Sequence, residues 1–236
     1  MDILSIDVGG QHVKVLATGQ TEERKVDSGP LMTAAMMAEA VKTMAADWTY
    51  DVVALGYPGP VVLGAPVKEP VNLGAGWVGF DYTAAFGKAT KIINDAAMQA
   101  LGSYEGGRML FLGLGTGLGS AMIVDGEVQP MELAHLPFKK GRTYEDYVGA
   151  RGLTRLGKKK WRRTVLVVVE ELRAALLPDY VVLGGGNAKL MRELPEFVRL
   201  GNNANAFAGG FRLWESPAMA ERPTSPPVPP SEPTTE

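Results

Sequence analysis

Asp95 is the residue of this sequence whose type and position are best suited to catalysis. The apolar pair Ile92-Ile93 predicts the end of a buried strand, Asn94-Asp95 follows at once, and the alanine-rich stretch after it predicts a helix. An aspartate at such a junction is most often a helix N-cap, because its side-chain oxygen accepts a hydrogen bond from the first free helical amides. In open α/β sheets, however, ligands bind at strand ends, where a carboxylate can accept a proton from a substrate hydroxyl.

Three glycine-rich loops each follow a hydrophobic stretch: DVGGQHVK at 7–14, GLGTGLGS at 113–120 and LGGGN at 183–187. Glycine lets the backbone approach a ligand closely, so that exposed amides can surround phosphate oxygens. The first two loops lead into a second predicted strand, whereas the third is expected to open a helix whose N-terminus favours anions. A single loop of this kind is more often a tight turn. Three in one chain favour a bound nucleotide or phosphate.

The elements that must position these residues alternate along the chain. Besides the helix after Asp95 and one after 187, the patterns predict strands at 3–8, 13–17, 51–57, 91–94, 108–115, 119–124 and 180–184, and helices at 32–48, 143–156 and 160–177. A strand–turn–strand unit recurs near 3–17 and 109–124, which predicts two similar α/β lobes with a cleft between them. We place the N-terminal lobe at 1–96 and the C-terminal lobe at 97–216. Residues 217–236 hold seven of the 16 prolines and are predicted to be disordered.

Composition limits the classes of protein to consider. The chain is 46% hydrophobic and 21% charged with a net charge of −2, which is typical of a soluble globular protein. Cysteine is absent, so disulfides and thiolate metal sites are excluded, in keeping with a reducing compartment. The first residues lack the features of a signal peptide, and the aliphatic run at 165–169 is far shorter than the ~20 residues that span a bilayer. We therefore expect a cytoplasmic protein with neither a membrane nor a nucleic-acid partner.

One segment is far more basic than the rest of the chain. Residues 139–163 contain ten Lys or Arg and two acidic residues, so the segment has a net charge of +8 and the rest of the chain a net charge of −10. Three interpretations remain open: a solvated helix face, a nucleic-acid patch, or a surface for another polyanion. The segment has no interleaved aromatic residue beyond Trp161 to stack on bases, which disfavours nucleic acid. Charge asymmetry of this size in an acidic protein favours a polyanionic ligand.

The order of the motifs resembles that of one known family. DVGG with Lys14, GYPGPV, NLGAGW, INDA, GLGTGLGSAMIVDG, ELAH, YEDYVGARGL and VVLGGG follow one another as they do in ROK-family sugar kinases. These kinases belong to the actin-like, RNase H-like ATPase superfamily, and the resemblance covers about residues 2–192. The lack of a zinc motif and the ending NANAFAGGFRLW are most similar to the polyphosphate glucokinase-like members. The resemblance implies an α/β, two-lobed actin-like fold with a cleft between the lobes.

The resemblance also implies an activity: transfer of a phosphoryl group to the 6-hydroxyl of a hexose, most simply glucose, with Asp95 as general base. The implied donor is ATP, inorganic polyphosphate or both, with Mg²⁺, and the implied assembly is a homodimer. The implied sugar-binding residues are Asn94, Glu132, His135 and Glu145. The implied phosphate- and nucleotide-binding residues are Asp7 (also near magnesium, through water), Gly9, Gly10, Gln11, Lys14, Gly115, Thr116, Gly117, Gly184, Gly185 and Gly186. On the polyphosphate branch, the basic segment, and in particular Lys158, Lys159 and Lys160, would contact that donor.

Three departures from the family pattern affect these expectations. Gln11 stands where a small hydroxyl residue is usual, and Ala134 stands where ELAH usually has glycine. The stretch LPFKKGRTY replaces the cysteine cluster that binds zinc in many relatives, so no zinc site is expected. The alternative to a kinase is a catalytically silent or regulatory sugar-binding ROK protein. Regulatory relatives carry a DNA-binding helix-turn-helix ahead of the kinase fold, whereas the first glycine loop here already begins at Asp7.

Overall fold

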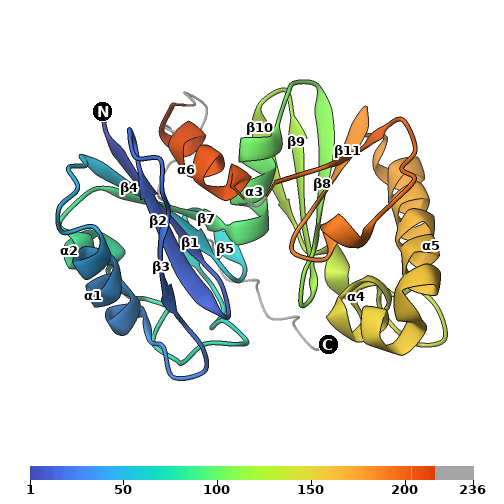
Figure 1. Cartoon of the computed structure of the whole chain (residues 1–236), viewed down its shortest axis with the longest axis horizontal. Helices are drawn as coiled ribbons and strands as arrows, with labels where there is room; N and C mark the ends of the chain where they lie inside the picture. Colours follow the sequence, from blue (N-terminus) through green and yellow to red (C-terminus); the bar gives the residue numbers. More distant parts are fainter. Residues whose placement is uncertain (203, 216–236) are drawn as a thin grey trace, which may run out of the picture.

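The computed structural model describes residues 1–202 and 204–215. They form two five-stranded sheets, with helices between the sheets and on their outer faces (Figure 1). The N-terminal sheet has the order β3-β2-β1-β4-β7 and consists of β1 (Ile3–Val8), β2 (His12–Ala17), β3 (Arg24–Asp27), β4 (Val52–Tyr57) and β7 (Thr90–Asn94). The C-terminal sheet has the order β10-β9-β8-β11-β12 and consists of β8 (Arg108–Leu114), β9 (Leu118–Val124), β10 (Glu127–Met131), β11 (Tyr180–Gly184) and β12 (Val198–Leu200).

The two sheets repeat one topology. In the first, β1 pairs antiparallel with β2 and parallel with β4. In the second, β8 pairs antiparallel with β9 and parallel with β11. The predicted strand–turn–strand repeat and the two-lobed α/β fold are therefore confirmed. Because parallel strands end at the same edge of a sheet, the ends of β1, β4 and β7 bring Asp7, Tyr57 and Asn94 to one edge.

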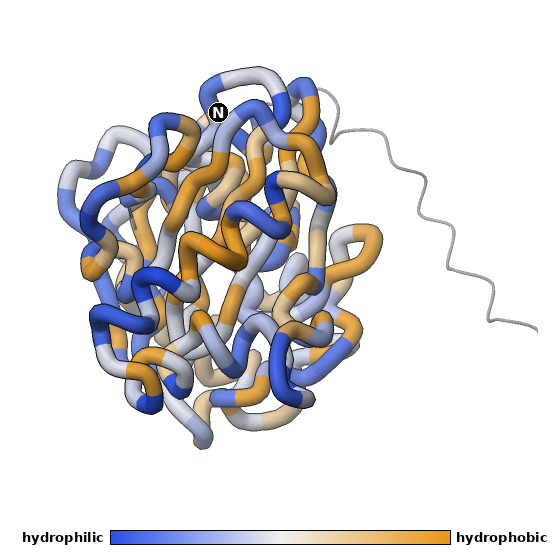
Figure 2. The backbone as a smooth tube through the Cα atoms, turned by 90° about the vertical axis from the view of Figure 1, so that its right-hand side faces the viewer, coloured by the Kyte–Doolittle hydropathy of each residue, from blue (hydrophilic) through white to orange (hydrophobic). Residues whose placement is uncertain are grey.

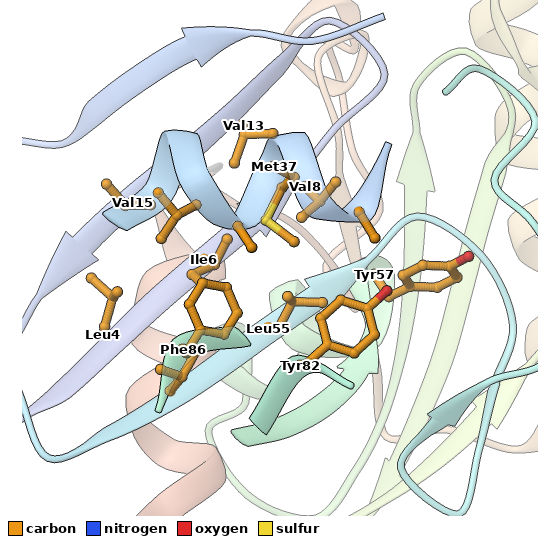
Figure 3. Packing of buried hydrophobic residues seen from close by; sticks show 14 of the residues in the cluster. Leu4, Ile6, Val8, Val13, Val15, Met37, Leu55, Tyr57, Tyr82 and Phe86 are labelled. Atoms are coloured by element: carbon orange, nitrogen blue, oxygen red, sulfur yellow. The ribbon is translucent and has the colours of Figure 1, made fainter. Parts of the chain in front are cut away.

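The outer face of the N-terminal sheet is covered by α1 (Ala34–Met44) and α2 (Tyr82–Phe86). Thr33 caps α1 by accepting a hydrogen bond from the N–H of Met36. Apolar side chains of the strands, such as Ile6 and Leu55, pack against Met37 and Phe86 of these helices (Figure 3). All six residues of β4 are buried, as expected for a strand whose two faces are both covered. This packing fixes the sheet edge at which Asp7 and Asn94 lie.

Two helices, α3 (Asp95–Ser103) and α6 (Asn205–Glu215), fill the space between the sheets (Figure 1). They cross closely because each has a glycine at the crossing: a Cβ atom at Gly102 would collide with the carbonyl of Asn205, and one at Gly209 with that of Met98. Helix α6 also packs on β1 and β4, and the indole N–H of Trp214 donates to the Val53 carbonyl at 3.0 Å. Residues 205–215 thus lie on the N-terminal sheet, although the predicted division put 97–216 in the other lobe.

The outer face of the C-terminal sheet is covered by α5 (Ala150–Leu176), which follows α4 (Tyr144–Val148); Figure 2 turns this side toward the viewer. The helix is interrupted at Gly157, whose φ of 72° and ψ of 157° are not helical. The predicted break between 156 and 160 is therefore present, but the structure adds a break at Gly149. Trp161 anchors the second half of α5, because its indole N–H donates to the Val148 carbonyl at 2.8 Å.

The remaining elements are short. They are the hairpin of β5 (Val61–Val62) and β6 (Ala65–Pro66) and two 3-10 turns, η1 (Leu133–His135) and η2 (Ala188–Leu190). The prediction that LGGGN opens a helix is wrong, because the loop is followed by the single 3-10 turn η2 and not by an α-helix. The predicted disordered segment 217–236 lies outside the described residues. Within the described part of the chain, no helix is long and apolar enough to cross a bilayer.

Candidate active site

Asp95 lies at the junction of β7 and α3, as the sequence predicted, but it is not the N-cap. Asn94 is the N-cap: its Oδ1 accepts a hydrogen bond from the N–H of Ala97 at 3.1 Å, and its Nδ2 donates to the Gly59 carbonyl at 3.0 Å. Asp95 is the first residue of the helix, and its Oδ1 accepts from the N–H of Ala96 at 2.8 Å. The common structural role of an aspartate at this position is therefore filled by its neighbour.

The environment of Asp95 raises the pKa of its carboxyl group, so the group stays protonated to a higher pH than an exposed aspartate does. Burial raises the pKa to about 7, and the nearby carboxylates of Asp7 and Glu132 raise it as well. The hydrogen bond from Ala96 and the position in the first helical turn act in the opposite direction, because both favour a negative charge. Desolvation is the largest effect. A carboxyl group that titrates near neutrality is suited to accept a proton from a hydroxyl.

Asp7 is the second carboxylate at this sheet edge. It occupies β1 opposite Lys14 of β2, and burial raises its pKa to about 6 even though Lys14 lowers it. The Lys14 ammonium lies 3.5 Å from the carboxylate of Glu23, so part of its charge is already balanced. The structure thus brings together three predicted residues, Asp7, Lys14 and Asp95.

The first glycine loop turns from β1 to β2 between these residues. The Gly9 amide donates to the His12 carbonyl at 2.9 Å, and the Ser28 hydroxyl donates to the Gly9 carbonyl at 2.6 Å. A Cβ atom at Gly10 would lie 3.1 Å from the Cβ of Asn72, so the loop is packed against the NLGAGW segment. Gln11 is exposed at the tip. The supporting residue Ser28 was missed, because no motif marks it, whereas Asn72 lies within a motif that was recognised.

The second glycine loop reaches Asp95 from the other lobe. A Cβ atom at Gly119 would lie only 2.7 Å from the Cβ of Ala96, the residue after Asp95. Glycine at 119 therefore allows β9 to lie directly against the beginning of α3. Gly115, Thr116 and Gly117 form the turn between β8 and β9, with Thr116 exposed. This contact sets the position of the turn relative to the carboxylate.

Glu145 of α4 lies against the same turn. Its Oε2 accepts a hydrogen bond from the N–H of Leu118 at 3.3 Å, and a side chain at Gly117 would collide with the Glu145 carboxylate. Thr143 and Asp146 form a capping box that fixes the start of α4. The Ala150 amide donates to the carbonyls of Gly115 and Thr116, each at 3.1 Å. Glu145 is thus held beside the second loop.

Glu132 precedes the 3-10 turn η1, and His135 is the last residue of that turn. The Ser120 hydroxyl of β9 donates to the Met131 carbonyl at 2.9 Å and accepts from the N–H of Leu133 at 3.2 Å, which anchors the turn on the sheet. Glu132 is exposed and close enough to raise the pKa of Asp95. His135 is exposed as well, and its imidazole has no hydrogen-bond partner among residues 1–202 and 204–215. Both side chains are accessible to a ligand.

The third glycine loop contacts the second. The Asn187 amide donates to the Leu114 carbonyl at 2.9 Å, and its Nδ2 donates to the Gly115 carbonyl at 3.1 Å. Gly184 is buried against the ring of Phe111, Gly185 has a φ of 80°, and Gly186 is exposed with open space beside it. Of the three glycines, Gly186 is the one with room for a ligand, whereas Gly184 has a packing role.

The donor set of this site fits a magnesium ion bound together with phosphates. Within the described ranges, no three His, Asp or Glu side chains gather as a preformed metal site. Mg²⁺ often needs only one or two carboxylates, because water and substrate phosphates complete its coordination. The carboxyls of Asp7 and Asp95 both have raised pKa values in this desolvated place, so a nearby cation would stabilise their charged forms.

Comparison with known proteins adds relatives in both sequence and structure. No family model matches the chain. The polyphosphate glucokinase of Mycobacterium tuberculosis is 29% identical over 227 residues, which covers 84% of this chain and 81% of that protein. The polyphosphate glucokinase of Mycobacterium leprae is 27% identical over 202 residues, which covers 78% of this chain and 59% of that protein.

Among solved structures, the inorganic polyphosphate/ATP-glucomannokinase of Arthrobacter sp. strain KM has a TM-score of 0.75 and 25% identity, over 89% of this chain and 96% of that one. A ROK-family glucokinase from Streptomyces griseus, in complex with glucose and AMPPNP, has a TM-score of 0.74 and 15% identity, over 90% of this chain and 99% of that one. The second likeness concerns the fold alone. Together these findings confirm the resemblance to ROK-family, glucokinase-like kinases that the motifs indicated, and with it the two-lobed actin-like ATPase fold.

Proposed function

We propose that this chain is a glucokinase-type hexose kinase that transfers a phosphoryl group to the 6-hydroxyl of glucose, with Asp95 as general base. The observation that carries the proposal is the raised pKa of Asp95 together with its position at the start of α3. Its carboxyl group has a pKa near 7, its capping role is filled by Asn94, and the second glycine loop lies against the residue that follows it. The curated relatives and the Arthrobacter structure, which are kinases of glucose or related hexoses by name, support the same activity.

In the proposed reaction, the Asp95 carboxylate accepts the proton of the 6-hydroxyl while that oxygen forms a bond to the terminal phosphorus of the donor. The bond between this phosphorus and the bridging oxygen breaks, and the shortened donor leaves with the electron pair. Phosphoryl transfer depends mainly on positioning and charge stabilisation, so one residue that orients the nucleophile is enough. A pKa near 7 lets Asp95 be ionised before the reaction and still hold the proton afterwards.

The sugar would be held by four polar side chains around Asp95: Asn94, Glu132, His135 and Glu145. A hexose has hydroxyls that both donate and accept, so carboxylates, an amide and an imidazole are complementary partners. Asn94 has already used one N–H and one oxygen lone pair in the fold. Its remaining N–H and lone pair are available to a sugar hydroxyl.

The donor phosphates would lie between the first and second glycine loops, near Lys14 and Thr116. Asp7 would hold a magnesium ion there, directly or through water, and the ion would neutralise charge on the donor phosphates. Gly186 leaves open space for the nucleoside of ATP. Because polyphosphate presents the same terminal group, both donors can use this cleft. A homodimer stays a prediction of the resemblance, and a cytoplasmic location stays a prediction from the composition of the chain.

A coupled assay of the purified protein tests this function. Glucose, mannose and other hexoses are each offered with ATP or long-chain polyphosphate, with and without Mg²⁺, and sugar phosphate is measured. We expect the fastest transfer to glucose, with no transfer once Mg²⁺ is removed. If glucose binds in calorimetry but neither donor is consumed, the chain is the silent sugar-binding protein that forms the alternative.

A further inference from the structure

A groove of about 1150 Å³ lies on the outer side of the C-terminal lobe, in the basic segment, and is lined by cations from two elements. The loop before α4 contributes Lys139, Lys140 and Arg142. Helix α5 contributes five more on either side of its break at Gly157: Arg155, Lys158, Lys159, Lys160 and Arg163. Among residues 1–202 and 204–215, no acidic residue lines the groove.

Most of the positive charge of this groove is not neutralised by the fold, although Arg142 and Arg155 lie near enough to the Asp146 carboxylate to help lower its pKa. None of its eight cations forms an ion pair with a carboxylate of residues 1–202 or 204–215. Like charges held this close repel one another, which disfavours the folded chain unless an anion binds. A solvated helix face would place its cations on one element and point them apart. Here the interruption of α5 and the facing loop arrange them around one concave surface.

The groove adjoins the candidate active site. Helix α4 lies between the two, because its Glu145 contacts the second glycine loop while its Tyr147 lines the groove. The Arg155 guanidinium also donates to the Asp146 carbonyl at 2.6 Å, which ties the groove wall to α4. A ligand in the groove is therefore separated from the second loop by a helix of five residues.

We propose that this groove binds the non-reacting part of a polyphosphate chain whose terminal group is used in the cleft. The choice of polyphosphate as ligand rests on the proposed function. The proposal adds a second binding surface, outside the catalytic cleft, that a long donor reaches and ATP does not. It extends the role expected for Lys158, Lys159 and Lys160 to the loop cations and to Arg155 and Arg163.

The aromatic residues of the groove favour polyphosphate over single-stranded nucleic acid. Binding of nucleic acid without sequence preference relies on open aromatic rings on which bases stack. Phe138 and Tyr147 line the groove, but they pack edge-to-face with centroids 5.0 Å apart. Lys139 covers Phe138 at 4.4 Å, and Arg155 covers Tyr147 at 4.9 Å. The groove thus provides charge without an open stacking surface.

Binding is measured first in the Asp95→Asn background, so that no donor is consumed. The groove variant replaces Lys158, Lys159 and Lys160 by alanine. The control variant replaces Lys25, Lys88 and Arg192 by alanine, which removes the same charge from exposed residues outside both the groove and the basic segment. Affinities for long-chain polyphosphate, tripolyphosphate and single-stranded RNA are then determined at several salt concentrations.

We expect the groove variant to bind long-chain polyphosphate roughly 10- to 100-fold more weakly at low salt, with the slope of log affinity against log salt smaller by about three. The control variant should stay within about twofold. With Asp95 restored, the groove variant should raise the KM for long-chain polyphosphate and leave that for ATP and tripolyphosphate unchanged. The proposal would be overturned if the control variant lost as much polyphosphate affinity as the groove variant, or if the groove variant bound polyphosphate as tightly as the wild type. It would also be overturned if the protein bound single-stranded RNA as tightly as long-chain polyphosphate.

These outcomes separate the groove from the proposed function. If the protein transfers no phosphoryl group to any hexose, the proposed function fails, while binding in the inactive background still reports on the groove. If the groove variant binds polyphosphate normally and the wild type still phosphorylates glucose from ATP, the proposed kinase function is supported. The proposed role of the groove in polyphosphate binding is then wrong.

Discussion

Asn94 caps helix α3 and leaves the adjacent Asp95 as the first residue of the helix, so two consecutive polar side chains have separate roles. The Asn94 side chain joins two segments, the first turn of α3 and the loop at Gly59. The carboxylate of Asp95 makes one local hydrogen bond, to the amide of Ala96. This division explains how a carboxyl group with a raised pKa can stand at a helix start without being needed as its cap.

Replacing Asn94 by alanine should lower both stability and sugar affinity. Loss of an N-cap costs about 1 kcal/mol, and the hydrogen bond to Gly59 is lost with it. The free energy of unfolding, from urea denaturation, should fall by roughly 1–2 kcal/mol. Asn94→Asp keeps a capping oxygen and serves as the control for the cap. An unchanged denaturation midpoint in Asn94→Ala would show that the cap contributes nothing.

Replacing Asp95 by asparagine should stabilise the protein at neutral and higher pH. Burial raises the pKa of Asp95 from 3.8 to about 7, so the folded state holds a proton that the unfolded state has lost. The contribution of Asp95 to stability is therefore highest below about pH 4 and falls as the pH rises toward 7. A shift of this size corresponds to at most about 4 kcal/mol, and solvent access to this half-buried residue reduces the expected gain to roughly 1–2 kcal/mol.

The pH dependence distinguishes this effect from ordinary repacking. The difference in unfolding free energy between Asp95→Asn and the wild type should be near zero at pH 4 and reach its maximum above pH 7. Asp125→Asn, in the exposed turn between β9 and β10, is a control with the same chemical change. A difference that does not vary with pH contradicts the account of a desolvated carboxyl group.

Replacing Gly119 by alanine should impair catalysis through its contact with Ala96. The added methyl group would lie 2.7 Å from the Cβ of Ala96, so β9 or the beginning of α3 must move, and Asp95 moves with it. We expect kcat to fall by one to two orders of magnitude, since small displacements in an active site have effects of this size. Ala96→Gly removes the opposing Cβ, so the double variant should recover activity relative to Gly119→Ala. Failure of this rescue would mean that the contact does not position Asp95.

Much of the fold followed from patterns within short segments. Strands β1, β8 and β11 are mainly apolar and lead into the glycine loops, and β4 is an apolar run that leads into PGP, so all four were predicted with bounds close to those observed. The elements that were missed depend on distant partners. Strand β3 has the sequence RKVD and is held by pairing with β2, and α6 is glycine-containing and amphipathic, with its place set by α3 and the N-terminal sheet. Such elements carry little local signal, because tertiary contacts stabilise them.

The site was predicted in its residues but not in its geometry. Asp95 was identified from its place after a strand, yet the sequence could not distinguish it from Asn94 as the cap. The approach of Gly119 to Ala96 joins residues of different lobes, and no spacing in the sequence encodes it. The basic segment was visible as a run of charge. Its arrangement around a groove depends on the positive φ of Gly157 and on the loop that faces it.

The measurement that tests the central claim most directly is the rate of glucose 6-phosphate formation by the wild type and by Asp95→Asn, at saturating glucose and ATP. We expect the wild type to turn over and the variant to lose about two to four orders of magnitude in kcat, the usual scale for loss of a general base. Glucose affinity should stay nearly intact, because the sugar-binding side chains are unchanged. Turnover by Asp95→Asn at a rate near that of the wild type would contradict the assignment of Asp95 as the catalytic base.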